Sequence, residues 1–120
     1  MPSYLFTVPK DHPETVRPWG GYTVLKKTKT MWIKKLYLRK NQRLSLQSHA
    51  LRNEVWFVLS GIAIIQIGKK QTRAQPGDTF FVPKNTKHRI SGITRACILE
   101  VAFGKVVEKD IVRYEDDYGR

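Results

Sequence analysis

Short runs of β-branched and aromatic residues, separated by turn residues, fill the chain from Tyr22 onward. The runs are YTVL, MWIKKLYL, RLSLQ, EVWFVLSG, IAIIQIG, DTFFVP, KHRIS and ACILEVAFG. Runs of this length and composition are typical of strands, and no long window shows the periodicity of a helix. The pattern therefore predicts an all-β fold of about seven or eight strands, arranged as an antiparallel sandwich or barrel.

The length of 120 residues corresponds to about one domain with one hydrophobic core. Residues 1–16 contain Pro2, Pro9 and Pro13 among mixed polar residues, and we expect an extended N-terminal arm there. Residues 17–120 are expected to form a single domain. Its last stretch, DIVRYEDDYGR, is rich in acidic residues, and we expect it either to be solvated or to pack in part through its apolar residues.

The charge of the chain favours anionic partners. Its 22 Lys and Arg residues against 10 Asp and Glu residues give a net charge of +12, which suits nucleic acids, acidic membranes or phosphorylated metabolites. Nucleic acid is the less favoured partner, because the basic cluster lacks interleaved exposed aromatic residues and matches no recognition motif. That cluster consists of Lys26, Lys27, Lys29, Lys34, Lys35, Arg39 and Lys40.

The compartment is predicted from what the sequence lacks. The N-terminus has no signal-peptide pattern, and no apolar run approaches the roughly 20 residues of a membrane span. The single cysteine, Cys97, cannot form an intramolecular disulfide. We therefore expect a cytoplasmic protein with no membrane partner.

Three polar residues interrupt the apolar segment at positions 44–61. Gln47 and His49 project from the same face of a strand, and a hairpin would fold Glu54 back beside them. His88 follows a turn in a second segment, PGDTFFVPKNTKH. Because buried polar groups need partners, these four side chains form a candidate site for Zn²⁺, or for Fe²⁺, Mn²⁺, Co²⁺ or Ni²⁺. The alternative is that this spacing arises by chance.

The arrangement around these residues resembles the two motifs of the cupin superfamily. Q-x-H-x4-E-x6-G begins at Gln47, and G-x5-P-x-N-x2-H ends at His88. The resemblance implies a cupin double-stranded β-helix, an antiparallel jelly-roll barrel with the metal inside. The first cupin motif usually begins H-x-H, and Gln47 stands in place of the first histidine.

Four segments are similar to the cupin domain of type II mannose-6-phosphate isomerases, which is usually fused to a GDP-mannose pyrophosphorylase. The segments are RPWGGYTVL, RLSLQSH, RNEVWFVLSG and DIVRYEDDYGR. In that group a glutamine holds the first ligand position, as Gln47 does here. No Gly-rich nucleotide loop is present, so no pyrophosphorylase activity is expected. Ala50, Leu51 and Val55 replace histidines usual in the family, which bears on substrate choice or activity.

The resemblance implies a metal-dependent interconversion of an aldose phosphate and a ketose phosphate. The reaction passes through an enediolate whose negative charge a metal can stabilise. For the phosphate we favour Arg52, which occupies the matching position of the first motif and offers a planar fork. Lys34 is the second candidate because it shares a face with Leu36, although a lysine near a strand end can also simply reach water.

The general base stays open between Glu100, a tail carboxylate such as Asp117, and a hydroxide held by the metal. Glu100 lies in the apolar segment ILEVAF and is also suited to a structural ion pair with a lysine or arginine. Arg113, with Asp116 and Asp117, is expected either to close the barrel mouth over the substrate or to pair only at the surface.

Two other functions stay open. One is a non-catalytic cupin that binds a sugar or sugar phosphate as a sensor or accessory subunit, which the replaced histidines favour. The other is a metal-dependent dioxygenase, which fits Gln47 and the C-terminal segment less well. Since cupin domains often pair through sheets and N-terminal arms, we expect a homodimer.

Overall fold

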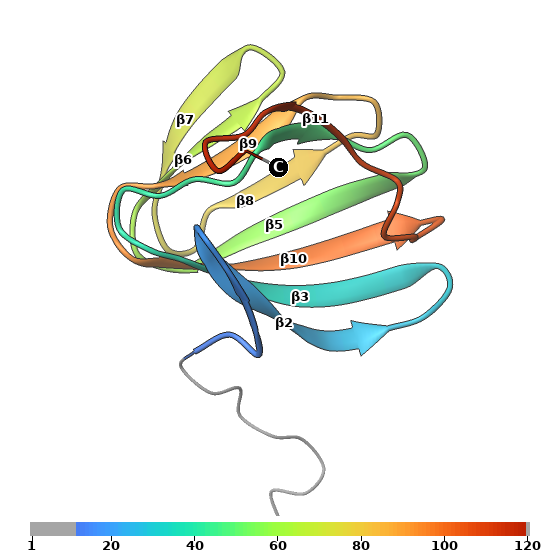
Figure 1. The fold of residues 1–120 in the computed structure, drawn as a ribbon, viewed down its shortest axis with the longest axis horizontal. Coiled ribbons are helices and arrows are strands. Elements are labelled where there is room, and N and C mark those ends of the chain that lie inside the picture. Colours follow the sequence, from blue (N-terminus) through green and yellow to red (C-terminus); the bar gives the residue numbers. More distant parts are fainter. Residues whose placement is uncertain (1–11, 120) are drawn as a thin grey trace, which may run out of the picture.

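The computed structural model describes residues 12–119, which form two antiparallel β-sheets facing each other (Figure 1). The six-stranded sheet has the order β1 (Thr15–Arg17), β2 (Gly20–Lys27), β3 (Met31–Leu38), β10 (Ala96–Gly104), β5 (Arg52–Ser60) and β8 (Thr79–Val82). The five-stranded sheet has the order β11 (Val112–Glu115), β4 (Leu46–Ser48), β9 (His88–Gly92), β6 (Ala63–Ile67) and β7 (Lys70–Ala74). This architecture confirms the predicted all-β antiparallel barrel.

Residues 12–119 contain strands, turns and loops but no helix. Accordingly, no helix that could cross a membrane is found in this part of the chain.

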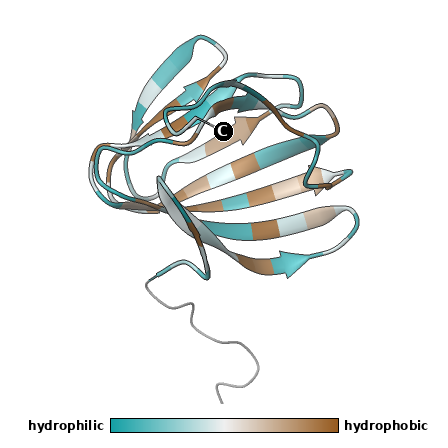
Figure 2. Cartoon of the chain, viewed as in Figure 1, coloured by the Kyte–Doolittle hydropathy of each residue, from teal (hydrophilic) through white to brown (hydrophobic). Residues whose placement is uncertain are grey.

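The core lies between the two sheets, where alternate residues of each strand turn inward. On β10, Ile98 and Ala102 are fully buried while Val101 between them is half-buried. Figure 2 shows the resulting alternation of hydrophobic and hydrophilic residues along β3, β5 and β10. The main buried cluster consists of Trp19, Leu36, Leu38, Trp56, Val58, Ala63, Ile65, Ala74, Val82, Ile90, Ala96 and Ile98.

The inner face of the six-stranded sheet changes from apolar to polar along the strands. Ile98 of β10 pairs with Leu36 of β3, both in the core. The next inward pair on the same strands is Glu100 with Lys34, both buried. The pair that follows, Ala102 with Trp32, is buried and belongs to a second, smaller apolar cluster. The buried charged pair therefore lies between the main core and this smaller cluster.

The predicted number of strands was wrong, because the described residues form eleven strands. The three that the apolar pattern misses, β1, β7 and β11, all lie at the edge of a sheet. An edge strand has one neighbour and is more exposed, so it needs no alternating apolar pattern. The sequences of β7, KQTRA, and β11, VRYE, are accordingly polar.

The two ends of the chain contribute to the sheets. The predicted arm, residues 1–16, lies mostly outside the described residues, but Thr15 and Val16 begin β1 and pair with β2. The C-terminal stretch packs in part, since β11 pairs with β4. The Tyr118 hydroxyl also donates a hydrogen bond to Gln42 Oε1 at 2.8 Å.

Candidate functional site

The four predicted metal ligands come from both sheets. Gln47 of β4 and His88 of β9 are register partners in the five-stranded sheet, and His49 follows directly after β4. Glu54 belongs to β5 in the six-stranded sheet. Glu54 therefore approaches from across the barrel, and the expectation that a hairpin folds it back beside β4 was wrong.

Three of these side chains form a buried cluster whose geometry could hold a metal ion. The candidate ligand atoms of His49, Glu54 and His88 all lie within 4.8 Å of one another. The fourth, Gln47, borders the same space, with Nε2 at 3.4 Å from His49 Nε2. Its Oε1 accepts a hydrogen bond from the Ser45 hydroxyl at 2.7 Å, and a half-turn of the amide would present that oxygen to the cluster.

Both histidines use Nδ1 to contact a backbone carbonyl. The distance is 2.7 Å from His49 to Asp110 O and 2.9 Å from His88 to Thr86 O. Since a carbonyl oxygen only accepts, each Nδ1 carries the hydrogen and each Nε2 keeps its lone pair. His88 Nε2 is buried and has no hydrogen-bond partner in the described part of the chain. A metal would satisfy this nitrogen, so the donor set fits such an ion.

Burial also keeps both imidazoles neutral. It lowers the pKa of His49 to about 4, with a further contribution from the positive charge of Arg52. Burial likewise lowers the pKa of His88. The neutral imidazole is the form that binds a metal.

We expect His49 and His88 of the metal-free protein to be neutral Nδ1–H tautomers at pH 7. Long-range ¹H–¹⁵N correlation spectra separate protonated from unprotonated ring nitrogens, so both Nε2 signals should appear at the unprotonated position. Addition of Zn²⁺ should then shift these two signals, while those of His12 stay in place. An Nε2–H signal from either buried histidine would contradict this assignment.

Arg52 lies against the ligand atoms. Its Nε donates to Glu54 Oε2 at 2.9 Å, and one terminal nitrogen is 3.1 Å from His49 Nε2. Its guanidinium carbon lies 4.6 Å from the centre of the Trp32 ring, and the residue is only 6% exposed. Much of its planar fork is thus used inside the cluster. A bound ion would replace Arg52 at the His49 lone pair, and the role of Arg52 in holding phosphate stays a prediction.

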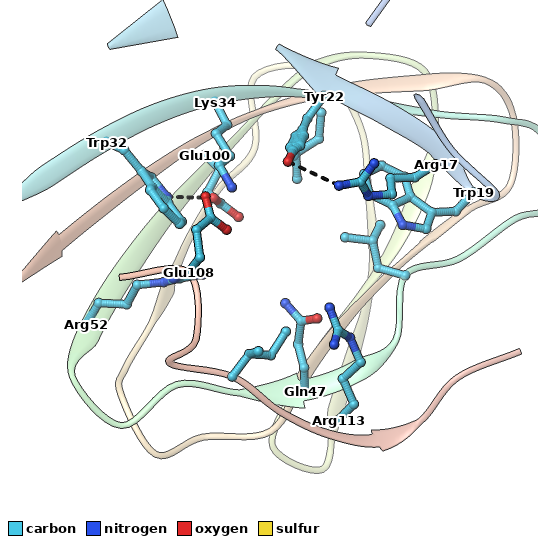
Figure 3. Close-up of a pocket in the computed structure, with 13 residues that line it drawn as sticks. Arg17, Trp19, Tyr22, Trp32, Lys34, Gln47, Arg52, Glu100, Glu108 and Arg113 are labelled. Atoms are coloured by element: carbon cyan, nitrogen blue, oxygen red, sulfur yellow. Dashed lines mark hydrogen bonds between the residues drawn. The ribbon is translucent and has the colours of Figure 1, made fainter. Parts of the chain in front are cut away.

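A pocket of about 140 Å³ opens beside this cluster (Figure 3). Its wall includes five of the predicted site residues, which are Lys34, Gln47, Arg52, Glu100 and Arg113. Gln47 and Arg52 border both the pocket and the cluster. A molecule in the pocket would therefore lie next to the candidate metal ligands.

Lys34 and Glu100 lie side by side in the pocket wall, as register partners on β3 and β10. Glu100 Oε2 accepts a hydrogen bond from Trp32 Nε1 at 3.1 Å. Lys34 Nζ lies 3.7 Å from the centre of the Trp32 ring and 4.4 Å from that of Tyr22. No ion pair within 4.0 Å involves Glu100 in the described residues. The structural ion pair considered for Glu100 is therefore not seen among them.

The Glu100 carboxyl titrates near neutrality. Burial, and secondly the negative charge of Glu54, raise its pKa to about 7, against the opposing positive charges of Lys34 and Arg52. Burial lowers the pKa of Lys34. A carboxyl with a pKa near 7 can both accept and return a proton at neutral pH.

Asp117, the other carboxylate considered as a base, lies outside the pocket wall. It accepts two hydrogen bonds from Arg43, at 2.7 and 2.9 Å. This bonding lowers the pKa of Asp117, which makes the group a weaker base. Of these two carboxylates, Glu100 is the one that the structure places at the pocket.

Two charged residues of the pocket wall, Arg17 and Glu108, were not recognised from the sequence. Arg17 is the first residue of the segment RPWGGYTVL, whose similarity to the family was the sequence signal that could have identified it. Its guanidinium donates to Val16 O at 2.9 Å and lies 3.5 Å from the Tyr22 hydroxyl. Glu108 lies 4.0 Å from Lys27 Nζ.

The positions at which the family usually has further histidines lie away from the pocket. Ala50 and Leu51 are exposed, and their backbone N–H groups donate to the Asp110 carboxylate at 2.9 and 3.0 Å. Val55 alternates with the inward-facing residues of β5. None of the three lines the pocket, so these replacements leave its wall unchanged.

Comparison with known sequences identifies related proteins. The family model described as "Mannose-6-phosphate isomerase C-terminal" matches residues 7–116. Similar curated proteins include mannose-1-phosphate guanylyltransferase RfbM of Salmonella typhimurium, 32% identical over 113 residues. The alginate biosynthesis protein AlgA of Pseudomonas aeruginosa is 34% identical over 114 residues. Each match covers 92% of this chain and 24% of the relative, so the chain spans about a quarter of these proteins.

Solved structures with low sequence identity share the fold. KdgF from Halomonas sp. superposes with a TM-score of 0.73 at 15% identity, covering 78% of this chain and 87% of that protein. A Klebsiella pneumoniae protein with a double-stranded β-helix domain gives a TM-score of 0.71 at 20% identity, covering 86% and 93%. The predicted double-stranded β-helix is thereby confirmed.

Proposed function

Because the chain belongs to the mannose-6-phosphate isomerase C-terminal family of cupins, we propose that it interconverts an aldose phosphate and a ketose phosphate. The pair to test is mannose 6-phosphate and fructose 6-phosphate. The observation that carries this proposal is Glu100, a buried carboxyl with a pKa of about 7, in a pocket that adjoins a His/Glu cluster.

The relatives' printed names refer to mannose-1-phosphate guanylyltransferase and to alginate biosynthesis. Since this chain spans about a quarter of their length, the proposal does not take the guanylyltransferase activity from them. It takes the isomerase reaction from the family description and from the chemistry of the pocket. Such a reaction would supply hexose phosphates to the synthesis of sugar nucleotides and polysaccharides.

The cluster would hold one divalent transition metal through His49, Glu54 and His88, with Gln47 as a fourth ligand. Zn²⁺ is the ion to test first, followed by Fe²⁺, Mn²⁺, Co²⁺ and Ni²⁺. The metal would supply Lewis-acid stabilisation of negative charge that develops on the substrate oxygens.

The residues of the chain perform the proton transfer. Glu100, ionised, takes the proton from C2 of the aldose, and the electrons of that C–H bond form the double bond of the enediolate. Protonated Glu100 then returns the proton to C1 while the hydroxyl proton of O2 passes to O1, which leaves the carbonyl at C2 and gives the ketose. The Trp32 indole holds the carboxyl in place through its hydrogen bond of 3.1 Å, and Lys34 places positive charge beside it.

The test is direct measurement of turnover. Protein loaded with Zn²⁺ or another of these ions is incubated with mannose 6-phosphate, and fructose 6-phosphate is followed by a coupled assay. Formation of fructose 6-phosphate that stops when the metal is chelated supports the isomerase. Binding of mannose 6-phosphate without turnover under any of these ions would support the non-catalytic sugar-phosphate binder instead.

A further inference from the structure

We infer that Arg17, together with Arg113, binds the phosphate group of the substrate at the end of the pocket opposite Glu100. The inference rests on the proposed function, because it assigns the second end of the same substrate. The ligand chemistry it names is a sugar phosphomonoester, whose phosphate carries up to two negative charges.

The charged residues of the pocket wall divide into two groups (Figure 3). One side of the wall contains both of its carboxylates and two of its cations, which are Lys34, Arg52, Glu100 and Glu108. Arg17 and Arg113 lie on the other side, where the wall has no carboxylate. With both carboxylates ionised the first group carries no net charge, whereas the second carries two positive charges, so a phosphate is attracted more strongly by the second group.

The cations of the pocket differ in how close a carboxylate lies to them. Arg52 forms an ion pair with Glu54 at 2.9 Å. Lys34 forms no ion pair within 4.0 Å among the described residues, but its register partner on β10 is the carboxylate residue Glu100. No ion pair in the part of the chain from 12 to 119 involves Arg17 or Arg113. These two guanidinium groups therefore keep their charge for a ligand.

The surroundings of Arg17 limit its movement. The side chain is half-buried, and its guanidinium carbon lies 5.4 Å from the centre of the Tyr22 ring. One terminal nitrogen is 3.5 Å from the Tyr22 hydroxyl and the other donates to Val16 O. These contacts leave further N–H donors, and a guanidinium suits the oxygens of a phosphate. Partial fixation lowers the entropy cost of binding.

The position of Arg113 links the phosphate end to the metal ligands. Arg113 of β11 pairs in register with Gln47 of β4, and Gln47 borders the cluster through His49. A substrate with its phosphate at Arg17 and Arg113 would therefore extend past Gln47 toward Glu100. This orientation places the reacting carbons, rather than the phosphate, next to the base.

The test compares binding of mannose 6-phosphate and mannose to the full chain by titration calorimetry. The variants are Arg17→Gln, Arg113→Gln and the double variant. Arg73→Gln is the matched control, because Arg73 is exposed on β7 and outside the pocket. Hydrogen bonds to charged groups correspond to about tenfold or more in affinity. The double variant should therefore bind mannose 6-phosphate at least about tenfold more weakly, with mannose binding unchanged.

Three results would overturn the assignment. They are wild-type affinity in the double variant, an equal loss in Arg73→Gln, and wild-type protein that binds mannose 6-phosphate no more tightly than mannose. Each single variant should also weaken binding, so failure of the double variant to fold does not prevent the test. Arginine-dependent binding without turnover would reject the isomerase and keep this phosphate site. Turnover with an unchanged KM in the double variant would support the isomerase and reject Arg17 and Arg113 as the phosphate site.

Discussion

Replacing Glu100 with glutamine is expected to lower isomerase turnover by about 10² to 10⁴-fold, the usual contribution of a general base. Glutamine has nearly the same shape and can still accept the hydrogen bond from Trp32, so the fold and the candidate metal ligands are kept. It cannot take a proton from C2. Turnover is measured by the coupled assay, and metal content is measured in the same samples.

The same substitution is expected to raise thermal stability at pH 8. The pKa of Glu100 is about 7 in the folded protein against an ordinary value of 4.5, so the folded state holds this proton more tightly than the unfolded chain. Ionisation of Glu100 therefore destabilises the fold progressively as the pH rises from about 4.5 to about 7, and fully above that. Glutamine removes this cost, so Glu100→Gln should raise the melting temperature more at pH 8 than at pH 4.

The activity of the wild type should depend on pH in the opposite sense. Only ionised Glu100 is a base, so kcat/KM should rise with pH through about 7. Burial raises this pKa most. Among the neighbouring charges, Glu54 raises it further, and Lys34, Arg52 and His49 lower it. Glu14→Gln removes an exposed carboxylate outside the pocket and should leave the pH profile unchanged.

Two results for Glu100→Gln would contradict these predictions. Full turnover would remove Glu100 from the mechanism. A melting temperature at pH 8 below that of the wild type would mean that the charge of Glu100 supports the fold.

The candidate metal ligands could be identified from the sequence because the pattern that contains them is local. Gln47 and His49 are two residues apart on a strand, and the spacing to Glu54 and the position of His88 after a turn complete a family motif. The apolar runs likewise predict the inner strands, since burial on one face imposes alternation. These patterns do not show which sheet each strand joins. The position of Glu54 in the sheet opposite Gln47 and His88 was therefore not predicted.

The pocket could be predicted only in part, because its chemistry depends on contacts between distant segments. Arg17 and Arg113 lie near opposite ends of the chain, on the edge strands β1 and β11 of the two sheets, and both line the pocket. Glu100 was one of several candidate bases, and its pKa follows from burial and from Glu54 on a neighbouring strand. The contacts of Arg52 with Glu54 and His49 could likewise be recognised only in the three-dimensional structure.

The second large effect is expected from His88→Ala, which should remove the metal. Wild-type protein purified without added metal should contain about one transition ion per chain, and the variant close to none. His88 Nε2 is a buried nitrogen whose lone pair has no partner among the described residues, and few other ligands are present to compensate for its loss. Elemental analysis of both proteins gives the answer directly.

Removal of the metal should also lower stability, because an ion that binds only the folded state stabilises it. The gain is about 4 kcal/mol when free metal exceeds its Kd by about a thousandfold. A chelator should therefore lower the melting temperature of the wild type and leave that of His88→Ala nearly unchanged. His12→Ala, which removes an exposed histidine, is the control and should behave as the wild type does. An ion retained by His88→Ala would show that His88 is not needed to hold it. Wild-type protein that binds none of the five ions on reconstitution would show that the cluster is held together by its own hydrogen bonds and Arg52 alone.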